Sequence, residues 1–109
     1  MEPMRITEQI METAKRLQNA SSEIFFIGKE KAETERAYRL ALMREIMKLR
    51  AEGLQATLIN DVARGNVADL LFARDAAEVK FKSAQESMAA LKSTLSALQS
   101  VLRIQEEAS

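Results

Sequence analysis

The sequence predicts an all-α fold: a long antiparallel helical hairpin that resembles a coiled coil, with an additional N-terminal helix and a short connecting helix. The composition favours helix, because hydrophobic residues make up 47% and charged residues 29% of the chain, with only three glycines and one proline. Apolar residues also recur at alternating steps of three and four, which is the period of an amphipathic helix. A chain of 109 residues is predicted to form one domain.

The first segment, residues 1–27, is predicted to be an amphipathic helix that ends in an apolar corner. Its apolar stripe consists of Ile6, Ile10, Ala14 and Leu17. Pro3 stands where the first turn of a helix tolerates proline. Gly28 is weak evidence for a boundary, whereas Ile24 and Ile27 continue the earlier stripe. The sequence therefore leaves two alternatives open: a break before a second helix, or one continuous helix.

The second helix is predicted over residues 29–52, because this segment is rich in strong helix formers and Gly53 follows it. Its apolar residues form two stripes, centred about 140° apart on the helix. One stripe is Tyr38, Leu42, Ile46 and Leu49, and the other is Leu40, Met43 and Met47. One neighbouring helix cannot cover both stripes, so another helix or another copy of the chain must do so. This predicts a homo-oligomer, of which a dimer is the simplest form.

A short connecting helix is predicted over residues 57–65. Thr57 is expected to cap its N-terminus and Gly65 to end it. Asn66 with Asp69 then resembles a capping box, in which Asp69 replaces the usual glutamate and favours the positive end of the next helix.

The last helix is predicted over residues 67–105 and has the a/d spacing of a coiled coil. The residues at these positions are Ala77, Phe81, Ala84, Met88, Leu91, Leu95, Leu98 and Leu102. Extending the spacing backward leads through Arg74 to Leu70 and Val67. A cation at an a position predicts an exposed stretch, an acidic partner or a register change. The four leucines at the C-terminal end of this series are the predicted self-association zone.

Residue types exclude much of the usual enzyme chemistry. The chain has no cysteine and no histidine, so it lacks thiol nucleophiles, disulfides and the commonest general base and zinc ligand. Asp69, Asp75 and Glu78 could in principle hold a magnesium ion, but each is better explained as a helix-start or surface residue. We therefore expect no enzyme, no metal and no cofactor. With no apolar segment of signal-peptide or membrane-spanning length, the expected location is the cytoplasm.

Four segments resemble a family of small uncharacterised helical proteins of phages and prophages. They are AYRLALMREIMKLRAEG, TLINDVARGN, DLLFARDAAEVKF and LSALQSVLR, and the similarity covers roughly residues 31–103. Members of this family look like products of phages of Gram-positive bacteria and are often encoded near replication and recombination genes. The resemblance implies a protein of the host bacterial cell, without implying a mechanism.

Two surfaces are candidates for binding. Four consecutive large apolar residues, Ile24, Phe25, Phe26 and Ile27, cannot all face one neighbour on a helix, so they predict a buried corner, a dimer contact or a docking site for another protein. Five basic residues could contact nucleic acid, and they are Lys29, Arg36, Arg39, Arg44 and Arg50. Glu33 and Glu35 interrupt them, which favours a rim of ion pairs such as Glu35 with Arg39.

The residue types and surfaces predict a non-enzymatic interaction protein that binds and modulates another protein, and the resemblance implies that it is phage-derived. Inhibition of a bacterial defence complex, such as a CRISPR effector, is the concrete form of this hypothesis. The alternative is a DNA-binding accessory protein of phage recombination or replication. A formal net charge of zero gives no overall attraction to nucleic acid or to anionic lipid, so we expect no membrane contact and favour a protein partner.

Overall fold

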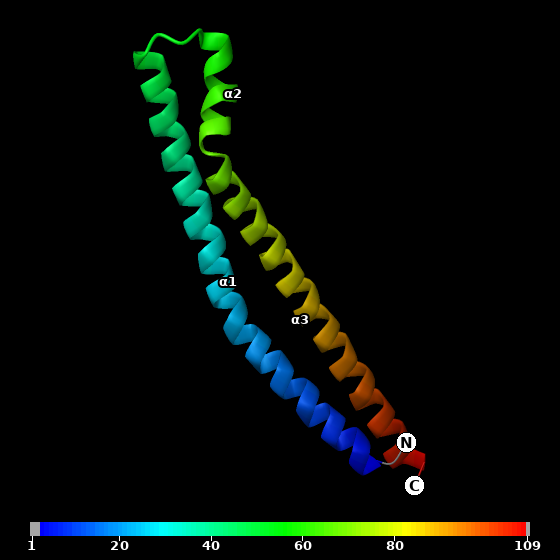
Figure 1. Cartoon of the computed structure of the whole chain (residues 1–109). Coiled ribbons are helices and arrows are strands. Elements are labelled where there is room, and N and C mark those ends of the chain that lie inside the picture. The colour runs from blue at the N-terminus through cyan, green and yellow to red at the C-terminus, as the bar shows by residue number, and fades with distance from the viewer. Residues whose placement is uncertain (1–2, 109) are drawn as a thin grey trace. The chain divides into compact units, whose positions relative to one another are not determined.

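The computed structural model describes residues 3–108, which fold into three α-helices (Figure 1). They are α1 (Pro3–Ala51), α2 (Ala56–Asn66) and α3 (Ala68–Ala108). None of the residues in this range lies in a β-strand. The all-α prediction is therefore confirmed.

Helix α1 is continuous through Gly28, so of the two alternatives left open by the sequence, a break or one helix, the structure has one helix. The separate helices predicted over 1–27 and 29–52 are one continuous helix, Pro3–Ala51. Ile24 and Ile27 before Gly28, and Lys31 and Thr34 after it, are all half-buried, so the same stripe of the helix is used on both sides of that glycine. Gly28 does not end the helix, because one helical glycine costs only about 1 kcal/mol relative to alanine.

The C-terminus of α1 is closed by a Schellman motif, as the position of Gly53 predicts. Gly53 has φ 84°, and its N–H donates to the carbonyl of Arg50 at 3.1 Å. The N–H of Leu54 donates to the carbonyl of Leu49, also at 3.1 Å. The Leu54 side chain packs against the cluster that contains Leu49, which is the apolar contact that usually accompanies this motif.

Helix α2 exists as predicted, but its ends are formed differently. The N-cap is Gln55, which makes no side-chain capping hydrogen bond, and Thr57 lies inside the first turn. Gly65 is also inside the helix, and the C-cap is Val67. The predicted roles of Thr57 as cap and Gly65 as stop are therefore wrong. Both residues are helical because Ile59 and Ala63 hold α2 against α1, so packing outweighs local capping preference.

Asn66 does not form the predicted capping box with Asp69. The Asn66 side-chain amide instead donates to Glu45 Oε1 at 2.7 Å, which links the end of α2 to α1. Asp69 lies in the first turn of α3, where its charge favours the positive helix end as predicted. Asn66 is the last residue of α2, so its backbone is helical and it does not take the N-cap position of α3.

The contacts within the chain define two compact units. The terminal unit comprises Met1–Phe26 and Lys82–Ser109, and the central unit comprises Ile27–Phe81. The prediction that residues 1–109 form one domain stays a prediction.

In the terminal unit, the N-terminal part of α1 packs beside the C-terminal part of α3 (Figure 1). Ile6 and Thr13 of α1 are buried. On α3, the a/d residues of this unit are half-buried: Ala84, Met88, Leu91, Leu95, Leu98 and Leu102. The leucines predicted for self-association therefore lie on the stripe that packs within the unit, and a role for them between copies stays a prediction.

In the central unit, α2 covers the end of α1. Leu49, Ile59 and Ala63 form a buried cluster, against which Leu42 and Ile46 pack. Burial of each large aliphatic side chain contributes roughly 1.5–3 kcal/mol, so this cluster is what holds the turn between α1 and α2 in place.

At the start of α3 the apolar stripe changes register. Leu71 is half-buried and Leu70 is exposed, so the predicted backward extension from Arg74 through Leu70 is wrong. Three-residue steps connect Leu71, Arg74 and Ala77, where the heptad pattern would have required a step of four. A straight α-helix drifts about 20° per heptad from a strict seven-residue repeat, and such a step returns the stripe to the neighbouring helix.

Substituting Gly53 with alanine is expected to lower the free energy of unfolding by about 1 kcal/mol, because an L-residue at positive φ is strained. Gly65 is the matched control, since it is helical and nothing lies within 4 Å of the Cβ it would carry. Gly65→Ala should raise stability by about 0.4–1 kcal/mol. Urea unfolding followed by circular dichroism measures the free energy of unfolding of both variants. We expect it to fall for Gly53→Ala and to rise for Gly65→Ala. A change of the same sign in both would contradict the positive φ assigned to Gly53.

Candidate interaction surfaces

The two apolar stripes of α1 differ in burial within the central unit. Tyr38 and Leu49 are buried and Leu42 and Ile46 half-buried, so the first stripe is covered within the chain. The second stripe is exposed: Leu40 lies at its edge, and Met43 and Met47 are 51% and 61% exposed. The chain therefore covers one stripe and leaves the other to solvent or to a partner.

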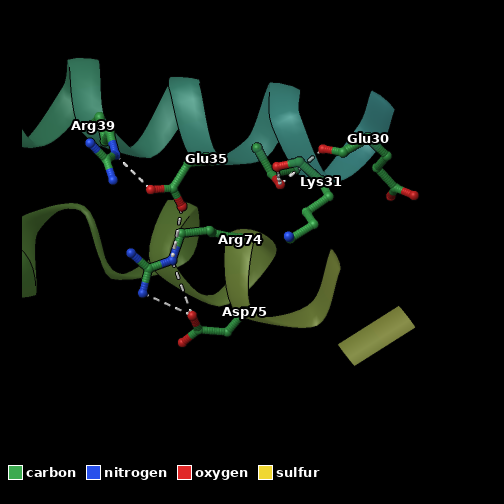
Figure 2. Close-up of polar contacts among 7 residues, drawn as sticks. Glu30, Lys31, Glu35, Arg39, Arg74 and Asp75 are labelled. Carbon is green, nitrogen blue, oxygen red and sulfur yellow. Dashed lines mark hydrogen bonds and ion pairs between the residues drawn. The ribbon is translucent and has the colours of Figure 1, made fainter. Parts of the chain in front are cut away.

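Arg74 lies at the centre of a polar network between α1 and α3 (Figure 2). Its Nη2 donates to Asp75 Oδ1 at 3.0 Å, and its Nε is 3.6 Å from Glu35 Oε2. The guanidinium also lies 4.6 Å from the centre of the Tyr38 ring, a cation–π contact. The hydrogen bond to Asp75 is the main cause that raises the pKa of Arg74, and burial opposes it in part. Arg74 therefore stays protonated.

The network extends along α1 through further pairs. Arg39 Nε donates to the other oxygen of Glu35, Oε1, at 2.6 Å, so this carboxylate has one arginine on each side (Figure 2). Lys80 of α3 is 3.1 Å from Glu30 of α1. Arg74, the cation at the predicted a position, thus has two acidic partners, Glu35 and Asp75. The change of register expected near it is present as well.

A groove of about 420 Å³ runs beside this network in the central unit. It is lined by Gly28, Lys31, Ala32, Glu35, Arg74, Glu78 and Phe81. Lys31 Nζ lies 5.2 Å from the centre of the Phe81 ring, and a Cβ on Gly28 would come within 3.2 Å of the edge of that ring. Gly28 therefore permits close approach of α3 instead of ending a helix. This contact was not predicted from the sequence, although an antiparallel alignment of the two stripes would have suggested it.

The acidic residues considered for magnesium do not form a cluster. Within residues 3–108, no three acidic, histidine or cysteine side chains are placed so that they could hold a metal ion. Asp75 instead accepts the hydrogen bond from Arg74. The same part of the chain contains no helix that is long and apolar enough to span a membrane.

The four apolar residues 24–27 divide into two kinds. Ile24 and Ile27 are half-buried, whereas Phe25 and Phe26 are 69% and 68% exposed. The two rings contact each other edge to face, with centroids 5.5 Å apart and planes at 84°. The buried-corner interpretation is therefore wrong for the two phenylalanines, because on a continuous helix adjacent residues point about 100° apart. A dimer contact and a docking site for another protein both stay predictions.

The five basic residues also divide into two groups. Lys29 lies 4.0 Å from Glu33, and Arg39 pairs with Glu35, so these two form the expected rim of ion pairs. Arg36, Arg44 and Arg50 are exposed, and they make no ion pair with any residue of the described range 3–108. Arg44 and Arg50 flank the exposed stripe of α1, and Arg36 lies in line with it one helical turn before Leu40.

Comparisons with family models, with curated proteins and with solved structures give no match to this chain. The resemblance to small phage proteins rests on the quoted segments and stays a prediction. The exposed surfaces described above are therefore the basis for inferring the function of the protein.

Arg74→Ala is expected to lower the melting temperature, and Arg74→Met to restore most of the loss. The reason is that the guanidinium lies over the Tyr38 ring, where a methionine side chain of similar length can also cover it, while ion pairs near the surface are screened by water. Thermal unfolding of both variants, at low and at high salt, separates the contribution of packing over Tyr38 from that of the ion pairs. A methionine variant as unstable as the alanine variant would show that the charge matters more than the packing.

Proposed function

We propose that this chain is a non-enzymatic, phage-derived interaction protein that binds another protein and changes its activity. The observation that carries the proposal is the exposed aromatic pair Phe25 and Phe26 on α1. Aromatic side chains are enriched among the residues that dominate binding energy at protein interfaces.

The surroundings of the pair suit a protein partner. Ser21 and Ser22 lie one helical turn before the phenylalanines and are exposed. Small polar side chains next to two large rings provide an apolar centre with a polar rim, which is the usual arrangement of a binding surface. The edge-to-face contact holds the two rings against each other, so less conformational freedom is lost on binding.

Within this class, the partner we propose is a bacterial defence complex, such as a CRISPR effector, which the protein would inhibit in the cytoplasm of the host cell. This choice rests on the phage resemblance. The exposed stripe of α1 further supports self-association, with a dimer as its smallest form, because Met43 and Met47 remain uncovered in the single chain.

A DNA-binding accessory role is the second candidate, and the three unpaired arginines favour it. Arg36, Arg44 and Arg50 are exposed and can reach phosphates. However, Met43 and Met47 lie between them, and the arginines spread over about 120° of the helix surface. Phosphate binding would leave these apolar side chains exposed, so the protein-binding proposal is preferred.

Replacing both Phe25 and Phe26 with alanine is expected to weaken capture of the partner about tenfold or more, because truncating an interface anchor costs upwards of 1 kcal/mol. The measurement is a pull-down with a purified defence effector, followed by titration of the bound complex. Met11→Ala is the matched control, since Met11 is as exposed as the rings and lies on the same helix. An effector that binds the double variant as tightly as the original chain would refute the proposed surface.

The DNA alternative predicts a different result. In a gel-shift at low salt, we expect no tight complex with single- or double-stranded DNA. If DNA were the ligand, changing Arg36, Arg44 and Arg50 to glutamine would weaken binding to all sequences, and the salt slope would fall by about one for each arginine that binds a phosphate. Tight DNA binding that weakens steeply with salt and depends on these arginines would establish the alternative.

A further inference from the structure

The central unit has two uncovered apolar faces of opposite charge. The first, here called the basic face, is the exposed stripe of α1 formed by Leu40, Met43 and Met47. Arg44 and Arg50 flank it, Arg36 lies in line with it one helical turn before Leu40, and none of the three has an ion-pair partner within residues 3–108. From residue 36 to residue 51, α1 carries five basic residues and one acidic residue. The acidic one, Glu45, is half-buried and bonded to Asn66.

The second, here called the acidic face, lies on α3. Phe72 and Val79 are 76% and 65% exposed and stand seven residues apart, which places them on one side of the helix. Asp69 and Asp75 are exposed on the same side of α3, and Ala76 lies between them. Asp75 is bonded to Arg74 but keeps its side chain 55% exposed.

The two faces match each other in spacing and in charge. Leu40 and Met47 are also seven residues apart, so both faces repeat over two helical turns, about 10.5 Å at 1.5 Å per residue. A basic face against another basic face would bring unpaired arginines together, and two acidic faces would bring aspartates together. Contact between unlike faces covers the apolar residues and brings the arginines to Asp69, which has no ion-pair partner within residues 3–108, and to Asp75, whose exposed carboxylate also accepts from Arg74.

We propose that the basic face on α1 of one copy binds the acidic face on α3 of a second copy. This inference rests on the self-association part of the proposed function and names its surface. Leu40 and Met47 pack with Phe72 and Val79 of the next copy, with Met43 between them, while Arg36 and Arg44 approach Asp69 and Asp75.

The position of the two faces decides what kind of assembly forms. Each face is turned away from the line where α1 and α3 meet, so the two faces lie on opposite sides of the central unit. A copy bound through its basic face still has a free acidic face. The contact is therefore heterologous, and association continues beyond a dimer unless the assembly closes into a ring.

Two variants that each disable one face test this arrangement. Met43→Asp places an acid in the basic face, and Phe72→Asp removes the anchor of the acidic face. Both positions are exposed, so the helices should be retained, which circular dichroism checks. Each variant alone should be monomeric in sedimentation velocity, with association weakened about tenfold or more. Met11→Asp, an exposed position outside both faces, should associate like the original chain.

Mixing the two variants is the decisive step. The Phe72→Asp chain keeps its basic face and the Met43→Asp chain keeps its acidic face, so the mixture should form one contact and stop at a 1:1 heterodimer. The heterodimer should weaken as salt is raised, since the paired charges are screened.

Several results would overturn the inference. A monomeric original chain at millimolar concentration would refute both it and the proposed self-association. An original chain that associates while the mixed variants stay monomeric would refute only the crossed contact, and so would an assembly that tightens with salt. Binding of the defence effector through Phe25 and Phe26 is measured separately, so its loss or survival does not affect this test.

Discussion

The structure depends on a geometric constraint: two paired helices can bury only one stripe of each. In the central unit that stripe runs through Tyr38 and Leu49, and burial of such side chains supplies most of the favourable free energy. The remaining apolar residues of α1 and α3, such as Met47 and Phe72, face solvent because nothing in residues 3–108 forms a third layer over them. This surplus of apolar surface underlies each functional proposal made for the chain.

The constraint also explains the polar network on the buried side. Arg74 occupies a position on the packing stripe, where a charged group is costly unless it is paired. Asp75 beside it, Glu35 across the helix pair and the Tyr38 ring together satisfy the guanidinium. Gly28 allows Phe81 to approach α1 nearby. These contacts fix the relative register of α1 and α3 in the central unit, since a shift by one residue would separate the partners.

The exposed surfaces differ in what they can bind. Phe25 and Phe26 form a compact aromatic pair with polar neighbours, which suits a foreign protein. The two faces of the central unit instead complement each other, and a second copy of the chain satisfies both apolar burial and charge. One short chain can thus present separate surfaces for a partner and for itself. Binding of a foreign protein and self-association can therefore be disrupted independently of each other.

Local sequence determined the helices, the Schellman glycine at Gly53 and the existence of two apolar stripes on α1, because helix propensity, positive φ and side-chain spacing act within a few residues. Tertiary structure alone decided the rest. It made Gly28 a point of close approach, placed Asn66 at the end of α2 with its amide on Glu45, and covered Leu71 more than Leu70. These outcomes depend on contacts such as Lys80 with Glu30, which join residues far apart in the chain. Local patterns carry no information about which distant helix will supply the competing contact.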